Sequence, residues 1–263
     1  MKVRAYAKIN LMLKVIRKLE NNYHELQMVN ARIKRHDVIK IKEAKKNEII
    51  FKKNRNISPD FILKVLNKFN GVYNIEKKYK IKIIKRIPVG SGLGGGSADA
   101  AAIINALYIY NNIEETIENK IEYFKELGAD IPYMFFDSPA IVEGIGEKIT
   151  PLDEIDMSNF IVVYPKIEVS TKKVFESNNK YSSKMSHEEI IEHIGKDVDI
   201  YENDLEETTS KLFYKWGIIK KALSKYGRVW MSGSGSSMII YITENRKKII
   251  KEIKKTIPYV KVL

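Results

Sequence analysis

The chain has 263 residues, of which 44% are hydrophobic and 30% charged, a balance typical of a globular protein rather than a disordered one. The absence of cysteine excludes disulfides and thiolate metal sites, and no apolar run is long enough for a bilayer span or a secretory signal, so we expect a cytoplasmic protein without a membrane partner. The net charge of +13 favours anionic partners without choosing among them, because lysines are spread over nearly every predicted solvated face.

The first predicted element is a strand over residues 2–15. Every second position is apolar (Val3, Ala5, Ala7, Ile9, Leu11, Leu13 and Val15), and most alternate positions are polar. This period of two predicts a long strand buried on one face only. It places Lys8 and Asn10 together on the other face.

The rest of the N-terminal half mixes strands and helices. Strand-like runs occupy residues 24–33, 37–44 and 48–51, and an apolar stripe at helical spacing predicts a helix over 58–69. A strand over 78–87 leads into a glycine-rich loop. Helices are then expected from about 97 to 111 and over 114–127, the second ending at Gly128. The segment 138–151 has the pattern of a hairpin.

The C-terminal half opens with a predicted strand over 159–166. A helix from about residue 170 and further helices follow, then strands near 228–231 and 236–243, a helix over 245–256 and a short last strand. Strands and helices alternate without a regular βαβ pattern, which predicts an α+β fold. We place the domain boundary in the segment 152–158, giving domains 1–155 and 156–263.

The segment PVGSGLGGGSADAAA, residues 88–102, allows four interpretations. A flexible linker does not usually lie between a strong strand and a strong helix. A Walker A loop needs a lysine, and residues 90–102 contain none. Gly90, Gly92 and Gly95 match a dinucleotide fingerprint, but the preceding strand alternates Lys with Ile instead of being apolar throughout. We favour an anion-binding loop that runs into a helix N-terminus, where Ser97 is either a cap or a contact for phosphate or Mg²⁺.

Three segments in the same order carry a resemblance to a known family. The loop resembles the P-x-x-x-G-L-G-x-S-[S/A]-A motif of the GHMP kinase superfamily, AYAKINLML (Ala5–Leu13) is similar to its first motif, and MSGSGSS (Met231–Ser237) to its third. The resemblance implies an ATP-dependent small-molecule kinase that uses Mg²⁺. It also implies a two-lobed fold, with an N-terminal domain like domain 2 of ribosomal protein S5, a ferredoxin-like C-terminal domain, and the active site between them.

The resemblance assigns the ATP phosphates to the glycine loop. The residues concerned are Pro88, Val89, Gly90, Ser91, Gly92, Leu93, Gly94, Gly95, Gly96, Ser97 and Ala98. Many members have a second serine at position 98, so Ala98 removes one hydroxyl near the phosphates. The glutamate that holds Mg²⁺ in some members has no assignable counterpart here, and we assign no protein metal site.

Further segments resemble one branch of the superfamily. These are YHEL (Tyr23–Leu26), GADIPYMF (Gly128–Phe135) and VST (Val169–Thr171). The branch phosphorylates the tertiary 2-hydroxyl of a cytidine diphosphate-linked methylerythritol in the non-mevalonate route to isoprenoid precursors. The implied partner is therefore that small molecule, with no nucleic acid and no membrane, and we expect a monomer or a weak homodimer.

The match to A-K-I-N and G-A-D-I-P makes Lys8 and Asp130 the predicted catalytic pair. From local sequence alone, Lys8 could be one of several solvated lysines, and Asp130 could cap a short helix. In the hypothesis, Asp130 is the general base for the hydroxyl, and Lys8 lowers the pKa of that hydroxyl and orients the base.

The resemblance also implies a set of substrate-binding residues. Tyr23 and His24 hold the cytosine ring, and Phe175 stacks on the same base, with core packing as its alternative. Lys85 contacts a nucleotide or substrate phosphate, unless the neighbouring Arg86 does so. The remaining predicted substrate contacts are Asn10 and Thr171. Asn21 and Asn22 replace the Asp-Gly that usually precedes Y-H-E-L, and because Asn tolerates left-handed backbone, we expect this turn to survive.

Three other functions stay open at this point. One is a different kinase of the same fold, such as a homoserine or mevalonate kinase, or an ATP-dependent decarboxylase. Another is a basic protein that binds nucleic acid, although no concentrated basic and aromatic patch occurs. The last is a nucleotide sensor without catalytic activity.

Overall fold

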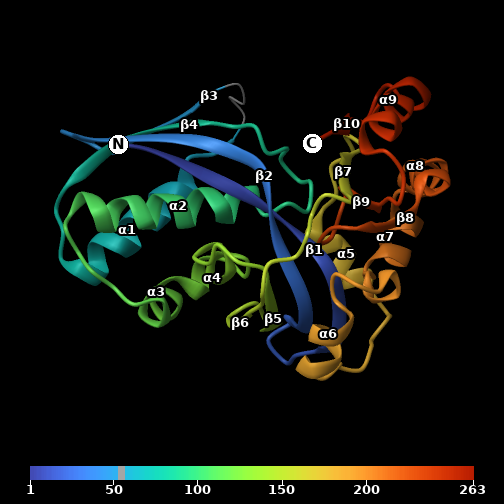
Figure 1. Ribbon diagram of the computed structural model, residues 1–263. Coiled ribbons are helices and arrows are strands. Elements are labelled where there is room, and N and C mark those ends of the chain that lie inside the picture. The colour runs from blue at the N-terminus through green and yellow to red at the C-terminus, as the bar shows by residue number, and fades with distance from the viewer. Residues whose placement is uncertain (53–56) are drawn as a thin grey trace. The chain divides into compact units, whose positions relative to one another are not determined.

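The computed structural model describes residues 1–52 and 57–263, which form two compact units (Figure 1). The first unit comprises Met1–Lys8, Arg32–Ile87 and Gly94–Asp137, and the second comprises Ile9–Ala31, Pro88–Leu93 and Ser138–Leu263. Two long strands, β1 (Lys2–Lys18) and β2 (His24–Ala44), pass through both. The expected boundary at 155/156 stays a prediction.

In the first unit, helices cover one face of a sheet. The C-terminal part of β2 pairs antiparallel with β4 (Lys78–Ile84), and β4 pairs parallel with β3 (Glu48–Lys52). The helices α1 (Asp60–Tyr73), α2 (Gly95–Tyr110), α3 (Ile117–Phe124) and α4 (Ile131–Met134) lie on one side of these strands (Figure 1). The predicted stripe of the first helix is buried at Ile62, Val65, Leu66 and Phe69, so α1 packs as its period indicated.

Two strand predictions for this region need correction. The runs 24–33 and 37–44 are one strand, β2, because the polar residues between them lie in extended backbone where side chains can reach solvent. The first strand is not half-buried: from Ala7 to Leu13 both of its faces are buried, including Lys8, Asn10 and Met12. A period of two identifies the apolar face, but it cannot show that the polar face is also covered.

The helix expected over 114–127 is also shorter than predicted. It begins at Ile117, because the Thr116 Oγ1 atom accepts a hydrogen bond from Asn119 N (3.2 Å) and caps the helix there. Its last turn, Lys125–Leu127, is a 3₁₀ helix that ends at Gly128. The helix after the loop begins at Gly95, two residues earlier than expected.

The second unit contains the predicted hairpin and a four-stranded sheet. The N-terminal part of β2 pairs with β5 (Ala140–Gly144), which forms the hairpin with β6 (Lys148–Pro151). The antiparallel sheet has the order β10 (Lys261–Val262), β7 (Phe160–Tyr164), β9 (Met238–Tyr241), β8 (Arg228–Met231). The helices are α5 (Thr171–Ser177), α6 (His187–His193), α7 (Glu206–Leu212), α8 (Tyr214–Leu223) and α9 (Arg246–Thr256), with 3₁₀ turns at Val198–Ile200 and Ser224–Tyr226.

Aromatic side chains form the core beside this sheet. Trp230 stacks on Tyr201 with ring centroids 4.8 Å apart, and Phe160 meets both rings edge-on. The amphipathic helix α9 buries Ile249 and Ile253. The α+β class is confirmed. Among the described residues, no helix is long and apolar enough to cross a bilayer.

Candidate active site

In the first unit, the predicted catalytic pair is in direct contact. Lys8 Nζ lies 3.2 Å from Asp130 Oδ1. The Lys8 side chain is 4% exposed, whereas the Asp130 side chain is 29% exposed. The ammonium is therefore held inside the protein, while the carboxylate still reaches the surface. This geometry suits a group that exchanges a proton with a bound molecule.

The alternative role of Asp130, as a helix cap, does not hold. Asp130 occupies the N-cap position of α4, but its side chain makes no capping hydrogen bond and its backbone is in the helical region. A capping side chain usually belongs to a residue with extended backbone. The structure instead turns the carboxylate toward Lys8, 122 positions earlier in the chain than Asp130 (130 minus 8).

The second half of the glycine loop, from Gly94, opens the 16-residue helix α2 in the same unit. Gly94 is the N-cap residue, so the interpretation of Ser97 as a cap is wrong. Gly94 has no side chain with which to cap this helix, and the first turn carries no acidic residue. A Cβ atom at Gly96 would meet nothing within 4 Å. The first N–H groups of α2 are thus left for a ligand or water, and the space beside Gly96 is open.

Ser97 and the catalytic pair border this helix start. A Cβ atom at Gly128 would lie 3.7 Å from Ser97 Oγ, so the hydroxyl faces the segment that leads to Asp130. A Cβ atom at Gly94 would lie 3.2 Å from the Lys8 side chain and 2.6 Å from that of Met134. The absence of a side chain at Gly94 is what lets the loop approach Lys8 so closely.

The first half of the loop lies in the second unit and packs against the MSGSGSS segment. Gly92 has φ of 74°, and a Cβ atom there would lie 2.1 Å from the Ser232 carbonyl oxygen. The Ser232 hydroxyl donates to the Gly92 carbonyl (3.1 Å), and the Ser237 N–H donates to the Ser91 carbonyl (3.0 Å). The two glycine-rich motifs therefore support each other through backbone contacts.

The second unit also brings together the predicted cytosine site. The rings of His24 and Phe175 are 5.1 Å apart and tilted by 38°. His24 is buried, Phe175 is half-buried rather than a core residue, and Tyr23 is 57% exposed. Burial, and then the positive charge of Lys18, lower the pKa of His24. The imidazole is therefore neutral near pH 7, with one ring nitrogen that donates and one that accepts.

Thr171 and the turn before Tyr23 also lie in the second unit. The Thr171 and Ser234 hydroxyls are 2.8 Å apart, so the start of α5 is joined to the MSGSGSS segment. Asn22 has φ of 65°, which confirms that an asparagine supplies the left-handed backbone of this turn.

The side chain of Asn10 is fully buried in an amide pair. Its Nδ2 atom donates to Asn30 Oδ1 (2.7 Å), and its backbone N–H donates to the Ser232 hydroxyl (3.2 Å). Its role in substrate binding stays a prediction.

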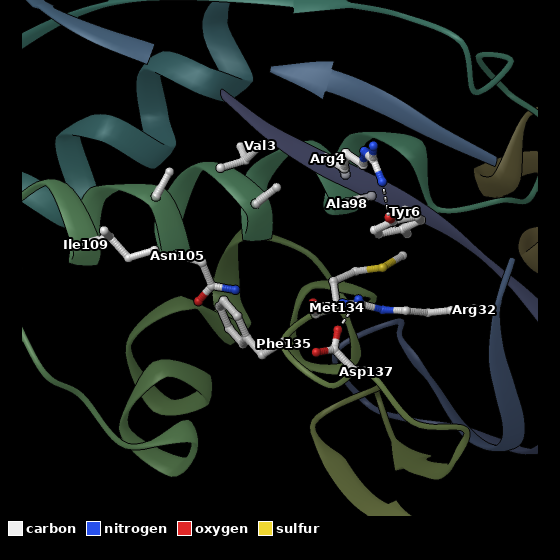
Figure 2. Close-up of a pocket in the computed structure, with 13 residues that line it drawn as sticks. Val3, Arg4, Tyr6, Arg32, Ala98, Asn105, Ile109, Met134, Phe135 and Asp137 are labelled. Carbon is white, nitrogen blue, oxygen red and sulfur yellow. Dashed lines mark hydrogen bonds and ion pairs between the residues drawn. The ribbon is translucent and has the colours of Figure 1, made fainter. Parts of the chain in front are cut away.

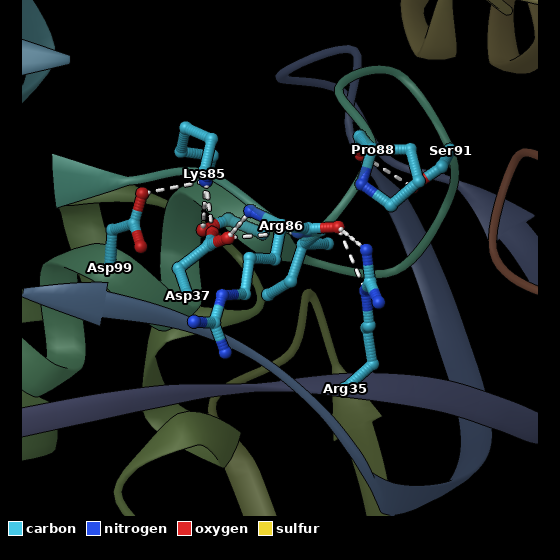
Figure 3. Close-up of polar contacts among 9 residues, drawn as sticks. Arg35, Asp37, Lys85, Arg86, Pro88, Ser91 and Asp99 are labelled. Atoms are coloured by element: carbon cyan, nitrogen blue, oxygen red, sulfur yellow. Dashed lines mark hydrogen bonds and ion pairs between the residues drawn. The ribbon is translucent and has the colours of Figure 1, made fainter. Parts of the chain in front are cut away.

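Lys85 lies in the first unit between two acidic side chains (Figure 3). Its ammonium contacts Asp37 Oδ2 and lies 2.7 Å from Asp99 Oδ2, and all three side chains are buried. Arg86 is exposed, and its backbone carbonyl accepts hydrogen bonds from Arg35. The structure thus presents Lys85 as the centre of an ion cluster. The Lys85 ammonium thus already has acceptors within the protein, and its predicted phosphate contact stays a prediction.

Sequence reasoning missed Asp37 and Asp99. Each had a visible signal: Asp37 lies on the same face of its strand run as Ile39 and Ile41, and Asp99 interrupts the alanines of SADAAA. A charged side chain at a buried position needs a partner of opposite charge. Two buried carboxylates on different elements therefore indicate one basic side chain that contacts both.

The first unit also contains a pocket of about 230 Å³ (Figure 2). Arg4, Tyr6 and Arg32 line one side of it, and the small side chains of α2 line another. Arg32 pairs with Asp137 and donates to the Met134 carbonyl (2.7 Å). Of the predicted site residues, only Ala98 lines this pocket, so it adds no support to their assigned roles.

Comparisons with known proteins agree with the motifs. Residues 60–144 match the model of the GHMP kinases N terminal domain. A 4-diphosphocytidyl-2-C-methyl-D-erythritol kinase of Caldanaerobacter subterraneus subsp. tengcongensis is 34% identical over 99% of this chain and 95% of its own. A crystal structure of 4-(cytidine 5'-diphospho)-2C-methyl-D-erythritol kinase is 25% identical with a TM-score of 0.78, over 100% of this chain and 98% of that one.

A third comparison shows the fold alone. The crystal structure of the mevalonate kinase of Methanococcus jannaschii is 19% identical, with a TM-score of 0.67, over 100% of this chain and 96% of that one. Together with the family match and the 25% identical structure, it shows that the chain has the GHMP kinase fold.

Proposed function

Because the chain belongs to the family of 4-diphosphocytidyl-2-C-methyl-D-erythritol kinases within the GHMP kinases, we propose that it uses ATP to phosphorylate the 2-hydroxyl of 4-diphosphocytidyl-2-C-methyl-D-erythritol. This step belongs to the non-mevalonate synthesis of isoprenoid precursors. The names of the relatives favour this substrate over homoserine or mevalonate. Within the chain, the observation that carries the proposal is the contact between Lys8 and Asp130.

The start of α2 fits a triphosphate. It offers uncapped N–H groups, no acidic side chain in its first turn and open space at Gly96. Mg²⁺ is commonly held by few protein ligands together with substrate phosphates, so a hydroxyl beside the phosphates suits it. Ser97 would be its protein contact. When bound, Mg-ATP supplies the phosphoryl group and neutralises charge on the phosphate oxygens.

Asp130 and Lys8 act on the acceptor. A tertiary alcohol is a weak acid, so Asp130 takes its proton as the oxygen bonds to the γ-phosphorus of ATP and the bond from that phosphorus to the ADP oxygen breaks. The Lys8 ammonium, 3.2 Å from the carboxylate, keeps that carboxylate oriented and stabilises negative charge on the acceptor oxygen. Because Lys8 is buried, its position is set by packing before the substrate arrives.

His24, Phe175 and Tyr23 recognise the cytosine ring. The half-buried ring of Phe175 offers a face for stacking, and the neutral imidazole of His24 can donate to or accept from the base edge. Thr171 orients α5 through its contact with Ser234.

An assay of substrate choice tests this function. The protein is incubated with Mg-ATP and each of a panel of alcohols: the cytidyl substrate, homoserine, mevalonate and galactose. We expect ADP release and a phosphomonoester on the substrate, detected by phosphorus NMR, with the cytidyl compound alone. Turnover confined to another alcohol, or ATP binding without any turnover, would refute the proposal.

A further inference from the structure

Lys85 has no donor to spare for a phosphate group. Its ammonium carries three N–H bonds, and three acceptors of the same unit surround it: Asp37 Oδ2, Asp99 Oδ2 at 2.7 Å and the Gly95 carbonyl at 3.4 Å (Figure 3). The side chain is 7% exposed, and those of Asp37 and Asp99 are 0% and 3% exposed. We call these three residues the Lys85 cluster.

The Lys85 cluster joins the two segments that flank the glycine loop. Asp37 Oδ1 accepts hydrogen bonds from the backbone N–H groups of Arg86 and Ile87, the second at 2.8 Å. These residues come directly before the loop. The Gly95 carbonyl belongs to the second half of the loop, where α2 begins, and Asp99 directly follows the last loop residue, Ala98. A carboxylate of β2 and one ammonium thus hold the residues before and after the loop to each other.

Other contacts hold the same peptide. Two nitrogens of the Arg35 guanidinium donate to the Arg86 carbonyl, Nε at 2.8 Å and Nη2 at 2.6 Å. The peptide that enters the loop is therefore bound at its N–H by Asp37 and at its carbonyl by Arg35. Such bonds restrict the backbone at the loop entrance more than packing alone would.

We propose that Asp37, Lys85 and Asp99 are positioning residues for the phosphate loop, and that Lys85 acts through these two carboxylates instead of contacting a phosphate. The inference rests on the proposed kinase function, since the loop is taken to hold ATP. It replaces the phosphate contact expected of Lys85 from the family resemblance.

The charges of the Lys85 cluster explain why Asp99→Asn should fold. Burial raises the pKa of Asp99, with Asp37 acting in the same direction and Lys85 against it. Burial disfavours the charged form of Lys85, but Asp99 and Asp37 outweigh it and raise the pKa of Lys85. Two buried carboxylates share one ammonium, so Asp99→Asn removes an excess negative charge and leaves the pair of Lys85 with Asp37 intact.

Asp99→Asn separates the two roles of Lys85. If the cluster positions the loop, weakening the Asp99 contact raises the KM for ATP about tenfold and leaves kcat and the KM for the cytidyl substrate within about twofold. If Lys85 is a phosphate ligand, releasing it from Asp99 leaves ATP affinity unchanged or makes it tighter. The second result, or an equal rise in both KM values, overturns the proposal.

Lys85 itself gives an independent comparison. We expect Lys85→Arg, which keeps the charge, to retain ATP affinity within about threefold, and Lys85→Met to lose more than about tenfold. Equal losses in the two variants would contradict the proposal. Asp37→Asn alters the hydrogen bonds to Arg86 and Ile87, so it should also raise the KM for ATP without raising the KM for the cytidyl substrate. This variant replaces Asp99→Asn in the test if Asp99→Asn does not fold. Asp153→Asn, at an exposed position after β6, is the control.

Titration with a non-hydrolysable ATP analogue keeps this test separate from the proposed function. A wild-type protein that binds the analogue but does not phosphorylate the cytidyl substrate refutes the proposed function alone. In that case the dissociation constants of the variants for the analogue still decide the role of the Lys85 cluster, with the same tenfold loss expected for Asp99→Asn.

Discussion

At the scale of single residues, the active-site chemistry depends on where two side chains lie relative to solvent. Lys8 is buried and Asp130 is partly exposed, although both are charged. Taking an ammonium out of water costs free energy, so a buried ion pair is weak evidence for a contribution to stability. This is consistent with the proposal that the pair acts in proton transfer.

Replacement of either member should separate catalysis from folding. We expect Asp130→Asn and Lys8→Met to lower kcat by about 10²- to 10⁴-fold, because one removes the base and the other its orienting charge. Melting temperature and the KM for ATP should change little for Asp130→Asn, whose site is partly exposed. Steady-state kinetics and thermal denaturation measure these effects.

Lys14→Met is the matched control for Lys8→Met. Lys14 is on the same strand and pairs with Glu202 at 2.5 Å, but no catalytic role is assigned to it. A loss of turnover in this control as large as that in Lys8→Met would show that β1 simply does not tolerate the loss of a lysine.

The lowered pKa of His24 sets a pH dependence for substrate binding. Because the folded value lies below the ordinary 6.5, His24 stays neutral as the pH falls through 6.5 and is protonated only at lower pH. The unfolded chain takes up its proton first, so this histidine's contribution to stability is complete above about pH 6.5 and is lost below it.

We therefore expect the KM for the cytidyl substrate to be constant from about pH 8 to 6.5 and to rise below that range. The KM for ATP, measured in the same buffers, is the reference. His24→Gln, which cannot be protonated, should remove the rise. If the midpoint of the rise in this KM lies at or above pH 6.5, or if the KM still rises at low pH in His24→Gln, the result would argue against a role of this imidazole in binding.

At the scale of elements, glycine occupies the positions of the loop for different physical reasons. Gly92 is needed because the Ser232 carbonyl occupies the position of a side chain and the backbone is left-handed. Gly96 faces open space in a helical turn, where glycine is a poor choice for stability. A helical glycine without a steric need is consistent with a ligand that occupies the space beside it.

Alanine substitutions should distinguish these reasons. Gly92→Ala forces the backbone to move and should destabilise the protein. Gly96→Ala and Gly71→Ala, both at open helical positions, should stabilise it by about 0.5–1 kcal/mol through helix propensity. Only Gly96→Ala should also raise the KM for ATP. Denaturant unfolding and kinetics check this, and an unchanged KM in Gly96→Ala would place the phosphates elsewhere.

At the scale of the whole molecule, the α+β class and the order of elements could be predicted because the patterns are local. The strand at the start of the chain, the hairpin and α9 follow from apolar spacing and turn residues that act within a few positions. The two wrong strand predictions also came from local patterns. The polar stretch inside β2 looked like a break, and the covered polar face of β1 looked solvated, because burial depends on partners that lie far away in the sequence.

The sequence by itself determined the reaction class and the substrate family, because the glycine loop, AYAKINLML, YHEL and GADIP are contiguous motifs whose resemblance to a known family can be read without the fold. Tertiary structure decided which residues act together. Only folding brings Asp130 to Lys8 and surrounds Lys85 with Asp37 and Asp99. The physical reason is that an ion pair depends on distance and desolvation, and neither quantity is encoded at any one position of the chain.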